Sequence, residues 1–114
     1  DAFYLKAKQV RTLIKQEYDK AFETYDVIMT PPAPPTALKL DEKTDDPIAM
    51  YLSDIMTIPV NMAGVPSISI PAGFSDGLPI GLQITGKPYA EAKLLNVAYA
   101  YEQAAGFYKQ EPTL

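Results

Sequence analysis

The chain has 114 residues, the length of one domain or of part of one, and 47% of them are apolar, which excludes a charge-rich disordered tail. Its 10 Lys and Arg against 14 Asp and Glu give a net charge of −4, which argues against a nucleic-acid site within the chain, because phosphate binding needs a positive field. With 0 Cys, 0 His and no apolar run of the roughly 18 residues that a membrane-spanning helix needs, the sequence excludes disulfides, thiolate nucleophiles, a Ser-His-Asp triad and a transmembrane helix.

Residues 1–24 are predicted to form an amphipathic helix. Apolar side chains recur there at steps of three and four residues, which places them on one helix face: Phe3, Ala7, Val10, Ile14, Tyr18 and Ala21. The other face is mildly basic, and we interpret it as a solvated surface and not as a nucleic-acid contact.

A short strand and a proline-rich segment are predicted next. Residues 27–29 are apolar and the run stops at Pro31, which is typical of a brief buried strand. Residues 31–35 are mostly proline, which lacks an N–H and fixes φ, so this run is expected to be extended and outside any sheet. Its Pro-x-x-Pro spacing also fits a ligand of a proline-binding domain, but a stiff loop is the favoured interpretation. The polar, acidic residues 36–46 are predicted to form an exposed loop.

The following segment is predicted to be a broken helix. Asp46 can cap a helix that begins at Pro47. Apolar residues then follow at helical spacing, at Ile48, Tyr51, Leu52 and Ile55. Pro59 interrupts this pattern, so residues 59–63 are expected to form a second short helix that ends at Gly64.

The last third of the chain is predicted to contain a β-hairpin and a helix. Residues 67–70 alternate strictly between two prolines, residues 80–84 form a second strand, and Ser-Asp-Gly at 75–77 is a turn signal. A final helix is expected over residues 90–104, and the tail after Gly106 is expected to be loose. The predicted fold class is therefore α/β, with a thin mixed β-sheet covered by helices.

Two patterns suggest enzymatic chemistry, and we reject both. Residues 81–87 match part of a phosphate-binding loop, but the next residue is proline, which lacks the required hydroxyl and N–H, and the segment alternates like a strand. Ser67 and Ser69 with Lys87 suggest a serine–lysine hydrolase. Nothing in the sequence brings Lys87 near them, so we interpret them as strand serines and a surface lysine.

Two polar residues of the broken helix have two interpretations each. On a helix that begins at Pro47, Asp54 would lie about 200° around the axis from Leu52, away from the apolar residues. There it is either a solvated aspartate or a carboxylate that faces a cleft and holds an ammonium group. Asn61 either satisfies backbone groups at a helix end or lines a site. The pattern alone does not decide between these interpretations.

Three stretches of the sequence resemble the amidase-signature family. They are YDVIMTP at 25–31, YLSDIMTIPVNMAGVPSISIPAG at 51–73 and GLPIGLQITG at 77–86. The resemblance implies the α/β fold of that family, with residues 1–114 as a C-terminal segment of a single amidase-signature domain. The sequence also begins directly with a predicted helix, which suggests a piece of a longer protein. The family's catalytic serine–serine–lysine set would lie upstream. No catalytic residue is therefore expected in this chain, and the chain alone is expected to be inactive.

Within the family, the sequence is most similar to the glutaminase subunits of glutamyl-tRNA(Gln) amidotransferases. The similarity lies in YLKA at 4–7 and in the spacing Asp-x-x-Thr-x-Pro-x-Asn-x-Ala-Gly at 54–64. It implies that Asp54 binds the α-ammonium group of glutamine and that Thr57, Pro59 and Asn61 form the wall of the pocket. Arg11, the only arginine, is expected to be a surface residue of the first helix.

The same resemblance implies partners and cofactors outside the chain. Ammonia from glutamine would pass to a B subunit that uses ATP and magnesium to convert Glu-tRNA(Gln), or in some relatives Asp-tRNA(Asn), with a small C subunit completing a cytoplasmic complex. The complex, not this chain, would hold the tRNA, and the chain itself would need no metal, cofactor or membrane. Two alternatives stay open: a general amidase acting on neutral amides, and a non-catalytic α/β interaction module.

Overall fold

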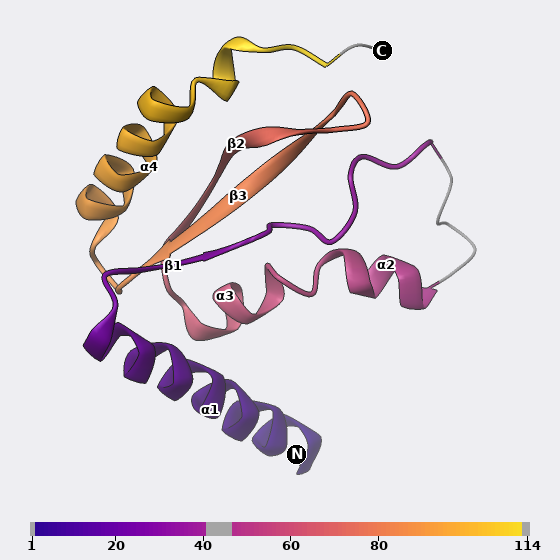
Figure 1. Ribbon diagram of the computed structural model, residues 1–114. Helices are drawn as coiled ribbons and strands as arrows, with labels where there is room; N and C mark the ends of the chain where they lie inside the picture. Colours follow the sequence, from indigo (N-terminus) through magenta and orange to yellow (C-terminus); the bar gives the residue numbers. More distant parts are fainter. Residues whose placement is uncertain (1, 41–46, 113–114) are drawn as a thin grey trace.

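The computed structural model describes residues 2–40 and 47–112, in which helices and strands are interspersed along the chain (Figure 1). In chain order the elements are α1 (Ala2–Thr24), β1 (Val27–Thr30), α2 (Pro47–Ser53), α3 (Ile58–Ala63), β2 (Ser67–Ser75), β3 (Leu78–Gly86), α4 (Glu91–Ala105) and the 3₁₀ helix η1 (Phe107–Lys109). The predicted α/β class, the broken helix and the hairpin are confirmed. The cap predicted at Asp46, and the acidic loop from residue 41 onward, lie outside the described residues.

The three strands form one antiparallel sheet in the order β1-β3-β2, and not a mixed sheet as predicted, so β3 is the central strand. β2 and β3 are joined by a two-residue turn in which Asp76 has φ 52° and Gly77 has φ 79°. Positive φ at both positions is the type I′ geometry that matches the twist of paired strands, and an Asp-Gly pair adopts it readily. The hairpin is therefore determined locally, whereas β1 joins β3 from a distant part of the sequence, with Thr30 opposite Gln83.

Helices lie on both sides of the sheet (Figure 1). α4 packs on β2 and β3, and the contact is a buried cluster of Ile70, Ile84, Leu94 and Ala98. On the other side, α1 and α3 enclose a second cluster, against which Ile28 of β1 packs: Phe22, Val60, Ala63 and Val65. Successive strand residues point to opposite faces, so Gln83 and Thr85, the neighbours of Ile84, point away from α4 toward the side of α1 and α3.

α1 packs mainly through its C-terminal half. Phe22 is buried and Ile14 is half-buried, whereas Phe3 is 93% exposed and Val10 is 51% exposed. Arg11 is exposed, as predicted, but its Nε–H also donates a hydrogen bond of 2.9 Å to the carbonyl of Met62 near the end of α3. A guanidinium is favourable at helix C-terminal carbonyls. This contact helps to hold α1 against α3.

Three local predictions were wrong in extent. β2 does not end at Pro71; it continues past a register shift between Pro71 and Gly73, which an edge strand tolerates because a proline there need not donate to a neighbour. β1 is only half-buried, with Met29 49% exposed, since it is the other edge strand. The tail is not loose throughout, because Phe107–Lys109 form η1, which contacts β2.

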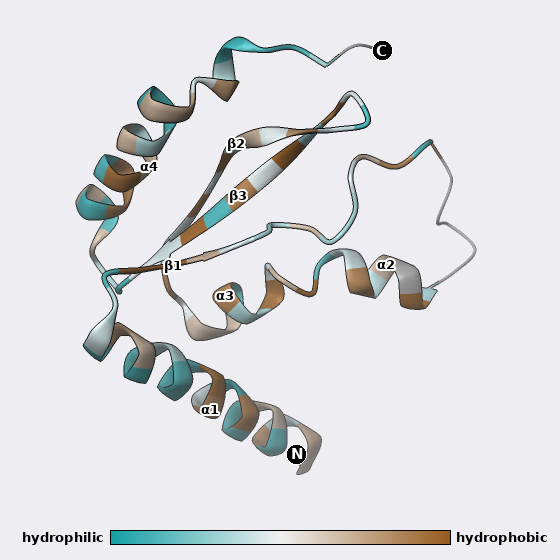
Figure 2. Cartoon of the chain, viewed as in Figure 1, coloured by the Kyte–Doolittle hydropathy of each residue, from teal (hydrophilic) through white to brown (hydrophobic). Residues whose placement is uncertain are grey.

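The apolar stripe predicted for α2 exists but is exposed. Ile48 is 70% exposed and Tyr51 is 74% exposed, and hydrophobic residues are visible along α2 in Figure 2. Ile55 lies beyond the end of the helix at Ser53, so it does not continue the stripe. None of the helices in the described part of the chain is long and apolar enough to cross a membrane.

Candidate functional site

Asp54 lies in a turn between α2 and α3, and not on a helix as predicted. Its carbonyl accepts hydrogen bonds from the backbone N–H groups of Thr57 and Ile58, both at 3.0 Å, and its own N–H donates to the carbonyl of Tyr51 at 3.2 Å. The helix ends because this turn, residues 54–57, redirects the chain toward α3. The backbone of Asp54 is thus fixed on both sides, while its side chain is exposed.

Thr57 and Asn61 use their side chains to hold this backbone. The Thr57 hydroxyl donates to the carbonyl of Asp54 at 3.1 Å, and the Asn61 side-chain amide donates to the carbonyl of Thr57 at 2.9 Å. The two bonds connect Asp54, Thr57 and Asn61 in one chain of contacts. The backbone-satisfying interpretation of Asn61 is therefore the one that the geometry supports.

Pro59 faces a cavity that Asp54 does not line. Pro59 lines this cavity, of about 410 Å³, together with residues of α1 and β1, namely Ile14, Glu17, Tyr18, Ala21 and Ile28. Asp54, Thr57 and Asn61 do not line this cavity. The four predicted site residues are close in sequence, but the structure brings only three of them into one hydrogen-bonded group.

Gln83 is the site residue that sequence reasoning missed. It is 5% exposed in the centre of β3, and its side-chain Nε2 donates to the Thr30 hydroxyl at 3.1 Å and to the carbonyl of Met56 at 3.0 Å. Met56 belongs to the 54–57 turn, so Gln83 connects the sheet directly to the turn that carries Asp54. The available signal was a large polar side chain in an otherwise apolar strand, because a buried amide needs hydrogen-bond partners.

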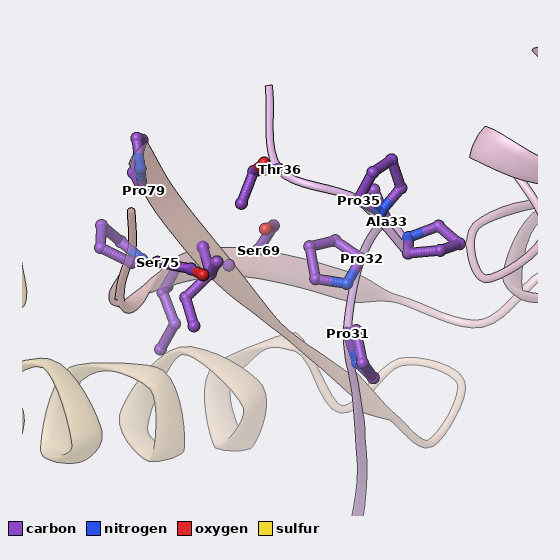
Figure 3. A pocket seen from close by; sticks show the side chains of 13 residues that line it. Pro31, Pro32, Ala33, Pro35, Thr36, Ser69, Ser75 and Pro79 are labelled. Atoms are coloured by element: carbon purple, nitrogen blue, oxygen red, sulfur yellow. The ribbon is translucent and has the colours of Figure 1, made fainter. Parts of the chain in front are cut away.

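A cavity of about 700 Å³ lies between the proline segment and the hairpin (Figure 3). Pro31, Pro32 and Pro35 lie on one side of it, and Ser69 and Pro79 lie on the hairpin side. Residues 31–35 lie outside the strands, as predicted. Asp54, Thr57, Pro59 and Asn61 do not line this cavity, so it is separate from the Asp54 turn.

The rejected enzymatic patterns have structural roles. The Ser67 hydroxyl donates to the carbonyl of Ile84 at 3.1 Å and lies 3.1 Å from the Thr85 hydroxyl, so it joins β2 to β3. Residues 81–86, which resembled a phosphate loop, are part of β3. Lys87 is exposed just after the strand.

One ion pair joins the sheet region to α4. The Lys93 ammonium lies 2.6 Å from the carboxylate of Asp26, just before β1. The hydrogen bond that Lys93 donates, together with its charge, lowers the pKa of Asp26 below its ordinary value. Both side chains are exposed, so the pair is a surface contact and not part of a buried reaction centre.

The chain is similar in sequence and in structure to known proteins. Residues 1–95 match the family profile described as Amidase. Two curated relatives, each named as the A subunit of glutamyl-tRNA(Gln) amidotransferase, align with 100% of the chain: the Rippkaea orientalis protein at 62% identity over 115 positions and the Moorella thermoacetica protein at 56% over 114. The chain spans 24% and 23% of their respective lengths. The crystal structure of the glutamyl-tRNA(Gln) amidotransferase A subunit from Thermotoga maritima matches with a TM-score of 0.87 and 44% identity, covering 91% of this chain and 23% of that one.

Proposed function

The chain belongs to the amidase family, and from that premise we propose that it is a segment of a glutaminase subunit. The whole protein would hydrolyse glutamine to glutamate and ammonia, and the ammonia would serve the conversion of Glu-tRNA(Gln) to Gln-tRNA(Gln). The observation that carries the proposal is the high identity, over the whole chain, to proteins named as the A subunits of such amidotransferases. Because the chain spans about a quarter of their length, we propose the activity for the full-length protein.

In this proposal Asp54 binds the α-ammonium group of glutamine. Glutamine is a zwitterion, so a site that selects it over neutral amides needs an anion at this group. The exposed carboxylate of Asp54, on a backbone fixed by the turn, is compatible with this role, and the similarity to proteins named as glutamyl-tRNA(Gln) amidotransferase A subunits supports it. A charge-assisted hydrogen bond contributes about 1.5–3 kcal/mol, which corresponds to roughly tenfold to hundredfold selection.

The other predicted pocket residues are proposed to position the turn and α3. Thr57 and Asn61 hold the turn and the start of α3 in place, and so shape the wall of the pocket without touching the substrate. Pro59 lines the cavity against α1, so its contribution would be to fix how α3 packs.

The groups that break the amide bond are assigned to residues outside this chain. The sequence has 0 Cys and 0 His, and the serine–serine–lysine set of the family is proposed to lie in the remainder of the protein. ATP and magnesium are assigned to a B subunit, with a small C subunit completing a cytoplasmic complex that holds the tRNA. Among the described residues, no group of three or more Asp or Glu side chains is placed to hold a metal ion.

Ammonia release from glutamine by the full-length protein, assembled with its partner subunits, tests the proposal. We expect equal amounts of ammonia and glutamate, and no release above the blank from the 114-residue chain alone. A general amidase would release ammonia from simple carboxamides at least as fast as from glutamine. A non-catalytic module would release none from either substrate, and release by the isolated chain would contradict the placement of the catalytic groups.

A further inference from the structure

We infer that Gln83 is a positioning residue that fixes the place of the Asp54 turn relative to the sheet, and thereby the place where Asp54 meets the substrate ammonium. This inference rests on the proposed function and adds to it a residue that does not touch the substrate. It predicts that changing Gln83 impairs recognition of the α-amino group more than it impairs hydrolysis itself.

The side-chain amide of Gln83 donates two hydrogen bonds, one within the sheet and one to the 54–57 turn. A carboxamide nitrogen has two hydrogens to donate. One goes to the hydroxyl of Thr30, the residue directly opposite Gln83 on β1, at 3.1 Å. The other goes to the carbonyl of Met56 at 3.0 Å. Because Thr30 and the backbone of β3 are both parts of the sheet, the sheet determines where the second hydrogen points.

The Met56 carbonyl is tightly coupled to Asp54. Both residues lie in the 54–57 turn, where the Asp54 carbonyl accepts from the N–H groups of Thr57 and Ile58 and from the Thr57 hydroxyl. These bonds make the turn a rigid unit, so a shift of the Met56 carbonyl carries Asp54 with it. The unit continues into α3, whose Val60 and Ala63 are buried, and it meets the sheet where the carbonyl of Met56 accepts from Gln83.

Apolar packing does little to hold the same turn. Ile55 and Met56 are 48% and 36% exposed, and neither belongs to a buried hydrophobic cluster. Gln83, in contrast, is 5% exposed, and a hydrogen bond made by a buried amide is stronger than one made in water. The loss of this bond would leave the carbonyl of Met56 free to move toward solvent, with Asp54 following it.

The test uses the full-length protein with its partner subunits and two substrates, glutamine and glutaramate, which is glutamine without its α-amino group. The readout is the ratio of the KM for glutamine to the KM for glutaramate, measured by ammonia release. Gln83→Met keeps the length of the side chain but removes the donor, and we expect it to raise this ratio about threefold to tenfold, the worth of one hydrogen bond. Gln103→Met, the same change at an exposed position of α4, is the matched control and should leave the ratio unchanged.

Further variants separate this inference from the proposed function. Asp54→Asn should raise the ratio more than Gln83→Met does, and the double variant should be no worse than Asp54→Asn alone, because Gln83 acts through Asp54. If Gln83→Met does not fold, Gln83→Asn, whose amide stops about 1.5 Å short of Met56, gives the same readout.

An unchanged ratio in the Gln83 variants, beside a raised ratio in Asp54→Asn, would overturn the inference and leave the proposed function standing. Equal rises of both KM values, or additive effects in the double variant, would also overturn it. Absence of ammonia release from glutamine by the unaltered protein would end both proposals.

Discussion

Gly81→Ala is expected to destabilise the protein by forcing the proline segment away from the sheet. A Cβ at Gly81 would lie 2.7 Å from Cγ of Pro32 and 3.1 Å from Oγ of Ser69. Ordinary contacts between carbon atoms are about 3.5–4.0 Å, so the Pro32 ring would have to retreat by about 0.8 Å or more. The Pro32 ring is closed on its own backbone and can change only its pucker, and its neighbour Pro31 is also proline, so most of the relief must come from a shift of the segment. Overpacking of this kind costs about 1–3 kcal/mol.

The change in unfolding free energy is measured by equilibrium urea denaturation of the full-length protein. Gly86→Ala is the matched control, because it lies in the same strand and its Cβ would meet Cβ of Leu94 at 3.6 Å, an ordinary contact. Removing a glycine there reduces the freedom of the unfolded chain, so the control should be neutral or slightly stabilising. Equal unfolding free energies for the two variants would refute the reasoning that Pro32 is fixed against β3.

Two further predictions concern the ion pair at Asp26 and the core under α4. Lys93→Met should raise the pKa of Asp26 toward its ordinary value, and NMR titration of the carboxyl carbon measures this shift. Because the folded pKa is the lower one, the stabilisation by Asp26 is present above its unfolded pKa and is lost as the pH falls through the folded pKa. An Asp26 pKa that is unchanged in Lys93→Met would contradict this prediction. Ile84→Ala should cost about 2–5 kcal/mol in urea unfolding, since Ile84 is 0% exposed and leaves a cavity against α4. Ile80→Ala, at a position 40% exposed, is the control and should cost clearly less; equal losses would refute the assignment of Ile84 to the core.

The elements that could be predicted from the sequence are those with local signals. The spacing of apolar residues located α1 and α4, and Gly64 and Gly106 ended helices where their backbones adopt φ 68° and φ 70°. The Asp-Gly pair identified the hairpin turn. In each case the determining interaction lies within a few residues of the element, so no knowledge of the tertiary structure was needed.

The features that could not be predicted depend on contacts between distant segments. The continuation of β2 past Pro71 requires knowing that β2 is an edge strand, which only the order of the sheet reveals. The turn at Asp54 accepts a hydrogen bond from Gln83, which lies 27 positions from Met56 in sequence. Helical periodicity carries no sign of such a distant contact, and it wrongly extended α2. Periodicity also predicted that Tyr51 belongs to an apolar face, but not that this side chain would be 74% exposed.

The role of Asp54 was likewise not decided by the sequence pattern. The spacing of apolar residues allowed either a solvated carboxylate or an ammonium site, and the structure shows an exposed side chain on a fixed backbone, which is compatible with both. The choice of the ammonium site comes from the similarity to glutaminase subunits.

The KM for glutamine of the full-length protein carrying Asp54→Asn tests the central claim most directly. The substitution keeps the size of the side chain and removes its charge. The proposed ammonium contact predicts a rise in KM of roughly tenfold to hundredfold relative to the unaltered protein, from the loss of a charge-assisted hydrogen bond. An unchanged KM would contradict the claim and make Asp54 a solvated residue of the turn.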